Sequence, residues 1–255
     1  MLHVPCIISI VLFSLSHIDS MGQNLHSSAE LLCNDTSGTV IRTTSLSHKT
    51  VFGEAAAAIL NAGLDGNEYG VMFGKDSSDS VIISKISTNG ARNSSPVNIG
   101  FPGAFADMHN HPGNTAPSAG DIYNLIKLNK DHPAFDTRFI ILPNGKLYAI
   151  VITDREKADS FVKKYRPEQT PGFSPRFPEQ QFNEFADLKS YLINIQNTDR
   201  TKADEIATAF MLNRYNSGVS LMLYVEQKRF AKVIVKESID GRGNRTYWME
   251  LCAIN

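Results

Sequence analysis

Two histidines one residue apart, followed directly by a Pro-Gly pair, constrain the fold of this 255-residue chain more than any other feature. The residues before them, Ala104 to Met108, are predicted to form a strand that leads into His109. Pro112 and Gly113 end that strand and turn the chain. A helix is predicted to begin at Ser118, a residue type that commonly caps helices. A strand that gives way to a helix within a few residues indicates an α/β arrangement.

The same arrangement extends over residues 51–155. An alanine-rich stretch that ends at a glycine predicts a helix over residues 52–64, and spaced apolar residues predict another over residues 118–130. Hairpins are predicted over residues 69–87 and 138–152, the second because Pro-Asn-Gly separates its two apolar runs. The order helix, hairpin, strand, helix, hairpin gives a compact α/β unit.

The segments on either side have a different character. Residues 1–23 are predicted to be a signal peptide, because residues 5–15 form an apolar run that is too short to span a bilayer. We therefore expect export to the periplasm or the cell exterior, and no membrane span in the mature chain; the alternative is a cytoplasmic protein that starts at Met21. Residues 24–50, rich in Ser, Thr and Asn, are predicted to be a linker. Residues 156–255 are predicted to be an α+β extension, either part of the same domain or a second layer.

Composition excludes several classes of protein. A content of 42% hydrophobic and 20% charged residues is typical of a globular protein. Lysine and arginine number 25 against 26 acidic residues, so no nucleic acid is expected as a partner. Three cysteines cannot form a disulfide scaffold or a four-thiolate zinc site. In an oxidising compartment Cys33 and Cys252 could pair, and two unrelated free thiols are the alternative.

The residues that can carry chemistry converge at the predicted junction of strand and helix. His109 and His111 project to the same face because side chains alternate along a strand. Asp121 lies in the first turn of the helix that follows. Two imidazoles and a carboxylate suit a catalytic Zn²⁺, which keeps its fourth position for water and lowers the pKa of that water from about 16 to about 7. The alternative is that Ser118 and Asp121 only cap the helix.

This segment resembles the JAMM signature of the JAB/MPN metallopeptidases, in particular the bacterial-type JAB domain. The signature consists of His-x-His-Pro, a short interval, Ser, two residues and Asp. Here His109-Asn110-His111-Pro112 and Ser118-Ala119-Gly120-Asp121 match, and the interval from Gly113 to Pro117 is one residue shorter than usual. The family also has an upstream glutamate on an early strand. Glu68 fits that description, whereas the competing Glu54 lies in a predicted helix.

The resemblance covers residues 51–155 and implies a fold, a cofactor and an activity. The implied fold is a mixed sheet flanked by helices, similar to that of cytidine deaminases. His109, His111 and Asp121 would bind Zn²⁺, and Glu68 would take a proton from the bound water and deliver it to the leaving amine. Ser118 would hydrogen-bond that water or the developing oxyanion. The implied substrate is a peptide or protein cleaved at an amide bond, often an isopeptide bond to a lysine side chain.

Two other interpretations of the same histidines remain. A JAB-like module can serve as a partner-binding domain without catalysis. The pattern Asp107-x-His109-x-His111 is also similar to the opening of PHP-type phosphoesterases and amidohydrolases. Those barrel enzymes take further histidines from later strands, and only His132 follows here. No sequence feature predicts the oligomeric state.

Overall fold

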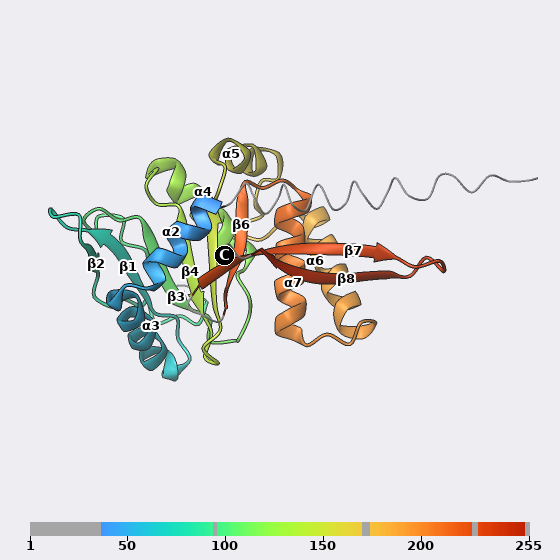
Figure 1. The fold of residues 1–255 in the computed structure, drawn as a ribbon, viewed down its shortest axis with the longest axis horizontal. Coiled ribbons are helices and arrows are strands. Elements are labelled where there is room, and N and C mark those ends of the chain that lie inside the picture. The colour runs from blue at the N-terminus through green and yellow to red at the C-terminus, as the bar shows by residue number, and fades with distance from the viewer. Residues whose placement is uncertain (1–36, 94–95, 170–173, 226–228, 253–255) are drawn as a thin grey trace, which may run out of the picture. The chain divides into compact units, whose positions relative to one another are not determined.

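One mixed β-sheet of eight strands runs through the computed structural model, which describes residues 37–93, 96–169, 174–225 and 229–252. The strand order is β2-β1-β3-β4-β5-β6-β7-β8 (Figure 1). The strands are β1 (Gly70–Lys75), β2 (Val81–Ile83), β3 (Ala106–Asn110), β4 (Thr137–Ile141), β5 (Leu147–Ile152), β6 (Val219–Val225), β7 (Arg229–Ile239) and β8 (Arg245–Cys252).

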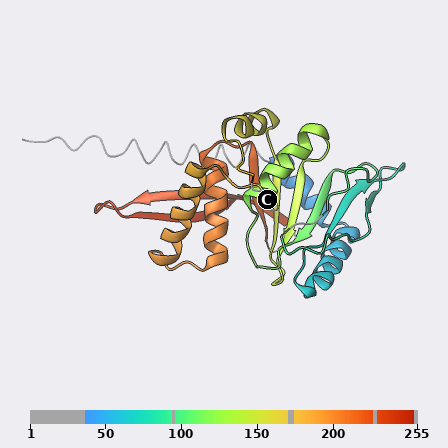
Figure 2. The same ribbon diagram turned by 180° about the vertical axis from the view of Figure 1, so that it is seen from behind.

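Helices cover both faces of this sheet. They are α2 (Ser37–Ser47), α3 (Thr50–Ala62), a 3₁₀ turn η1 (Gly63–Asp65), α4 (Ala119–Asp131), α5 (Arg155–Lys164), α6 (Glu179–Asn194) and α7 (Arg200–Arg214). Helices α2 and α3 pack on one face, whereas α4, α5 and part of α7 pack on the other, as the two opposite views show (Figures 1 and 2). Among the described residues, no helix combines the length and apolar character needed to cross a membrane.

Side-chain alternation along β4 explains this layering. Phe139 and Ile141 are buried in the cluster under α2 and α3, and the intervening Ile140 is buried in the cluster under α4. A strand covered on both faces is apolar at every core position rather than at every second one. The apolar run predicted as a strand here is therefore a central strand of the sheet.

The site is positioned by the register of three strands. Strand β3 pairs in parallel with β4, so that Asp107 lies opposite Arg138 and His109 opposite Ile140. Helix α4 makes the connection between these two parallel strands. On its other side β3 pairs antiparallel with β1, with Gly70 opposite His109. The start of β1 is thereby brought next to the end of β3.

The predicted mixed α/β class is confirmed, and so are the main elements of residues 51–155. The predicted helices over 52–64 and 118–130 correspond to α3 and α4. The predicted hairpins over 69–87 and 138–152 correspond to β1–β2 and β4–β5. Periodicity identified these elements because each has one strongly apolar face or run.

The structure differs from the sequence prediction within residues 24–50. Residues 37–47 are helix α2, so this part of the range is not a linker. The helix buries Val40 and Leu46, and the hydroxyl of Thr44 accepts a hydrogen bond of 3.0 Å from the backbone N–H of Phe230. Its stability comes from packing against distant strands, which local sequence does not reveal.

Residues 156–255 are continuous with the preceding sheet. Strand β6 pairs antiparallel with β5, which joins the two parts along a full strand edge. Helix α7 also supports the loop between β3 and α4: the hydroxyls of Thr201 and Thr208 donate to the backbone oxygens of Asn114 and Pro117. The predicted extension is thus an integral part of the unit formed by residues 36–255.

Two predictions involve residues 1–36, which lie outside the described residues. They are the signal peptide over residues 1–23 and the pairing of Cys33 with Cys252. Cys252 itself, at the end of β8, is disulfide-bonded. The other two cysteines of the chain, Cys6 and Cys33, both lie outside the described residues.

Candidate metal centre

The two histidines lie where β3 ends. His109 is on the face of β3 that packs under α4, and only 3% of its surface is exposed. His111 follows the last residue of the strand and is also buried. Their Nε2 atoms are 3.2 Å apart, so both rings direct a nitrogen at the same point. The alternation of side chains along the strand produces this arrangement, as predicted from the sequence.

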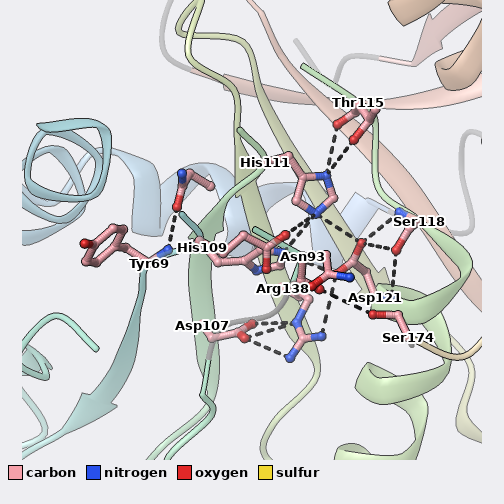
Figure 3. A network of polar contacts seen from close by, with 12 residues as sticks. Tyr69, Asn93, Asp107, His109, His111, Thr115, Ser118, Asp121, Arg138 and Ser174 are labelled. Carbon is pink, nitrogen blue, oxygen red and sulfur yellow. Dashed lines mark hydrogen bonds and ion pairs between the residues drawn. The ribbon is translucent and has the colours of Figure 1, made fainter. Parts of the chain in front are cut away.

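Asp121 reaches this point from the first turn of α4. Ser118 is the N-cap of that helix, and the two residues form a capping box. The Ser118 hydroxyl donates to Asp121 Oδ2 at 2.7 Å, and its backbone N–H donates to the same oxygen at 2.8 Å. The predicted helix cap is therefore present, and the carboxylate of Asp121 also lies within 3.2–3.4 Å of the two histidines (Figure 3).

The donor atoms of the two histidines and Asp121 lie close together. Asp121 Oδ1 lies 3.2 Å from His109 Nε2, and Asp121 Oδ2 lies 3.4 Å from His111 Nε2. One donor atom from each of the three residues lies within 4.8 Å of the other two, so this group could hold a metal ion.

Hydrogen bonding also prepares His111 as a ligand. Its Nδ1 lies 3.0 Å from the backbone oxygen of Thr115, to which the ring donates. In the neutral ring, a donor at Nδ1 leaves the lone pair on Nε2, the atom that faces His109 and Asp121. His109 Nδ1 is buried and has no hydrogen-bond partner among the described residues.

Glu68 lies beside this group, two residues before the start of β1 at Gly70. Its Oε1 is 4.0 Å from His111 Nε2, and only 6% of the residue is exposed. Burial raises the pKa of Glu68 from its ordinary value of 4.5 to about 7, although the nearby His111 and Arg138 act in the opposite direction. The competing Glu54 is exposed on α3 and does not line the cavity described below.

Burial and the neighbouring charges shift the pKa values of His109, His111 and Asp121. Burial lowers the pKa of His109. For His111 burial acts in the same direction, but the carboxylates of Asp121 and Glu68 outweigh it and raise the pKa to about 8. Burial alone would raise the pKa of Asp121, yet the two histidines hold it well below its usual range. Without a metal, one positive charge therefore resides mainly on His111 at neutral pH.

Two residues that the sequence analysis did not assign hold the site together. The first is Arg138, which binds Asp107 through Nε at 3.0 and 3.1 Å and through Nη2 at 2.9 Å. Its Nη1 is 3.9 Å from Asp121 Oδ1. Asp107 is thereby committed to an ion pair and is not part of the group that can hold a metal. Only the pairing of β3 with β4 brings these residues together, so no local pattern could have indicated them.

The second is Asn110, the residue between the two histidines. Its side-chain amide donates to the backbone oxygen of Asn67 at 3.0 Å and accepts from the backbone N–H of Tyr69 at 2.7 Å. These two groups flank Glu68 on both sides. Asn110 therefore fixes the backbone that carries Glu68 against the end of β3.

A cavity of about 810 Å³ opens over this group. Glu68, His109, His111, Ser118 and Asp121 all line it. Residues of the C-terminal part contribute as well, because Ser174 and Arg176 lie on its wall. The sequence-predicted site residues are thus brought together in one cavity.

No family model matches the chain, and no curated protein matches it.

Proposed function

We propose that this protein is a zinc-dependent hydrolase of amide bonds in peptides or isopeptides. The observation that carries the proposal is the convergence of two imidazole nitrogens and the Asp121 carboxylate next to a buried glutamate. Such a three-ligand set leaves the fourth position for water, as in catalytic zinc sites. The resemblance of the ligand pattern to the JAMM signature supports amide hydrolysis rather than another hydrolytic reaction, and supports a JAB/MPN-like fold.

In this proposal His109, His111 and Asp121 hold the zinc ion. Zinc supplies Lewis-acid chemistry, because it lowers the pKa of a coordinated water to about 7. Glu68 takes up a proton from water and delivers it to the leaving amine, because its carboxylate lies beside the group that would hold the metal, 4.0 Å from His111 Nε2. Glu68 is buried where it lines the cavity, so little of its surface faces bulk water.

Ser118 and Arg138 keep Asp121 in place. Ser118 supplies two hydrogen bonds to Oδ2, and Arg138 lies beside Oδ1. These contacts leave Asp121 little rotational freedom, and a fixed carboxylate loses less entropy when it binds a metal. A direct role of Ser118 toward water or an oxyanion stays a prediction.

We also propose that the protein acts outside the cytoplasm, after export by an N-terminal signal peptide. The disulfide of Cys252 supports this location, because disulfides persist in oxidising compartments. The apolar run at residues 5–15 supports it independently.

The proposal is tested with zinc-loaded wild-type protein and the zinc-loaded Glu68→Gln variant. Both are incubated with a pool of quenched fluorescent peptides and with a lysine-linked isopeptide, and bound zinc is measured on the same samples. We expect one zinc per chain in both proteins and a loss of at least about 100-fold in hydrolysis for Glu68→Gln. The matched control is Glu54→Gln, which changes an exposed glutamate outside the cavity and should keep full activity.

Equal hydrolysis by wild type and Glu68→Gln at equal zinc content would contradict the assignment of Glu68. A wild-type protein that binds zinc but hydrolyses none of the substrates would favour a partner-binding module instead.

A further inference from the structure

The wall of the cavity carries more positive than negative side chains. Among the described residues that line it, the acidic ones are Glu68 and Asp121, both part of the site itself. The basic side chains on the wall are Arg92, Lys127, Arg138 and Arg176. The chain as a whole has a formal charge of −1, so four cations on one cavity wall are not expected from its composition.

Two of these four cations already have carboxylate partners. Arg138 is paired with Asp107, and Arg176 is paired with Glu168. Arg92 has no carboxylate partner in the described part of the chain: its Nε donates to the backbone oxygen of Gly66 at 3.3 Å. Lys127 likewise has no ion-pair partner among the described residues. Arg92 and Lys127 are therefore the cations available to a bound molecule.

These two cations approach the cavity from different elements. Lys127 follows Asp121 by six residues on α4, which places it about 9 Å further along the helix axis. That distance corresponds to about three residues of an extended peptide. Arg92 is held against Gly66, two residues before Glu68, and so is anchored near the opposite end of the site.

We propose that the cavity recognises acidic peptides, with a carboxylate two or three residues from the amide bond that is cleaved. This inference rests on the proposed function and names its substrate class. Arg92 and Lys127 would each pair with a carboxylate of the substrate, while the amide lies over His109, His111 and Asp121. A carboxylate of this kind comes either from an acidic side chain or from a free C-terminus.

The expected size of the effect follows from the exposure of the two cations. Both side chains are exposed, and single exposed ion pairs contribute little, so each substitution should weaken binding about three- to fivefold. Removing both should weaken binding by about tenfold or more. The effect should decrease at high salt, because added ions screen exposed charges.

Binding is measured separately from catalysis, with the zinc-loaded Glu68→Gln variant and fluorescence anisotropy. The probe is a fluorescein-labelled, C-terminally amidated heptapeptide of alanines with glutamates at its second and sixth positions. A peptide with glutamines at those positions is the neutral comparison. A third peptide, with glutamines and a free C-terminal carboxylate, distinguishes the two sources of negative charge.

We expect the acidic peptide to bind at least tenfold more tightly than the neutral one. Lys127→Gln and Arg92→Gln, each added to Glu68→Gln, should reduce only the binding of the acidic peptide. Lys130→Gln, an exposed lysine on the same helix that does not line the cavity, is the control and should change nothing.

Equal binding of the acidic and neutral peptides overturns the proposal, as does an equal loss of both in the Lys127 and Arg92 variants. If only the peptide with the free C-terminal carboxylate binds tightly, the recognised group is a C-terminus and not an acidic side chain. If wild-type protein hydrolyses no peptide while the charge preference persists in binding, the proposed function fails and the recognition of acidic peptides stands.

Discussion

The raised pKa of Glu68 has a direct consequence for stability. In the unfolded chain this carboxyl group titrates near its ordinary value of 4.5, whereas in the folded, metal-free protein it titrates at about 7. Between these values the folded protein holds a proton that the unfolded chain has released. The contribution of Glu68 to the free energy of unfolding is therefore fully present below pH 4.5 and is lost as the pH rises through about 7. The difference corresponds to about 3 kcal/mol.

The substitution Glu68→Gln removes this titration and keeps the shape of the side chain. We expect the metal-free variant to match wild type near pH 4.5 and to exceed its free energy of unfolding by about 3 kcal/mol above pH 7. Urea unfolding from pH 4.5 to 8, in the presence of a chelator, measures the difference. Added zinc should reduce it, because a nearby cation favours the ionised carboxylate.

Glu54→Gln is the control, since Glu54 is exposed on α3 and its substitution should leave the unfolding free energy unchanged at every pH. A difference in unfolding free energy between Glu68→Gln and wild type that does not vary with pH would contradict the raised pKa of Glu68. It would mean that Glu68 is not desolvated in the folded protein.

Three further predictions concern the metal, the backbone beside Glu68 and the C-terminal part. Zinc affinity, measured by competition with a chelator, should rise about tenfold per pH unit between pH 6 and about 8 and then level off. The reason is that His111 must lose its proton before it can bind zinc. An affinity that does not change with pH would contradict this. Asn110→Ala should leave zinc content unchanged and lower kcat by about ten- to hundredfold, because Glu68 loses its two-sided anchor; unchanged kcat would exclude a positioning role. Tyr148→Phe should lower the free energy of unfolding, measured by urea titration, by about 1 to 3 kcal/mol. The buried carboxylate of Glu205 then loses the hydroxyl that donates to it at 2.6 Å. A variant as stable as wild type would show that this hydrogen bond contributes nothing.

The sequence allowed prediction of those parts of the site that are local. His109, His111 and Asp121 lie within 13 consecutive residues, so the geometry of one strand and one helical turn was enough to bring them together. Glu68 lies far upstream and was assigned from the type of element around it and from the family resemblance. The structure places its carboxylate 4.0 Å from His111 Nε2.

The remaining features depend on which strands are neighbours. The ion pair of Arg138 with Asp107 exists because β3 and β4 are parallel and in a particular register. Helix α2 has weak apolar periodicity and is stabilised by packing against strands almost 200 residues away. The joining of β6 to β5 likewise involves a pairing across a long stretch of chain. Contacts of this kind are not encoded in a local window of sequence.

The metal site can be observed in a crystal structure of the zinc-loaded protein, with the metal located by its anomalous scattering. We expect one zinc ion bound by His109 Nε2, His111 Nε2 and an Asp121 oxygen at about 2.0–2.2 Å. We also expect that the carboxylate of Glu68 faces the fourth coordination position. Zinc bound elsewhere, or a Glu68 side chain turned away from that position, would contradict the proposed site.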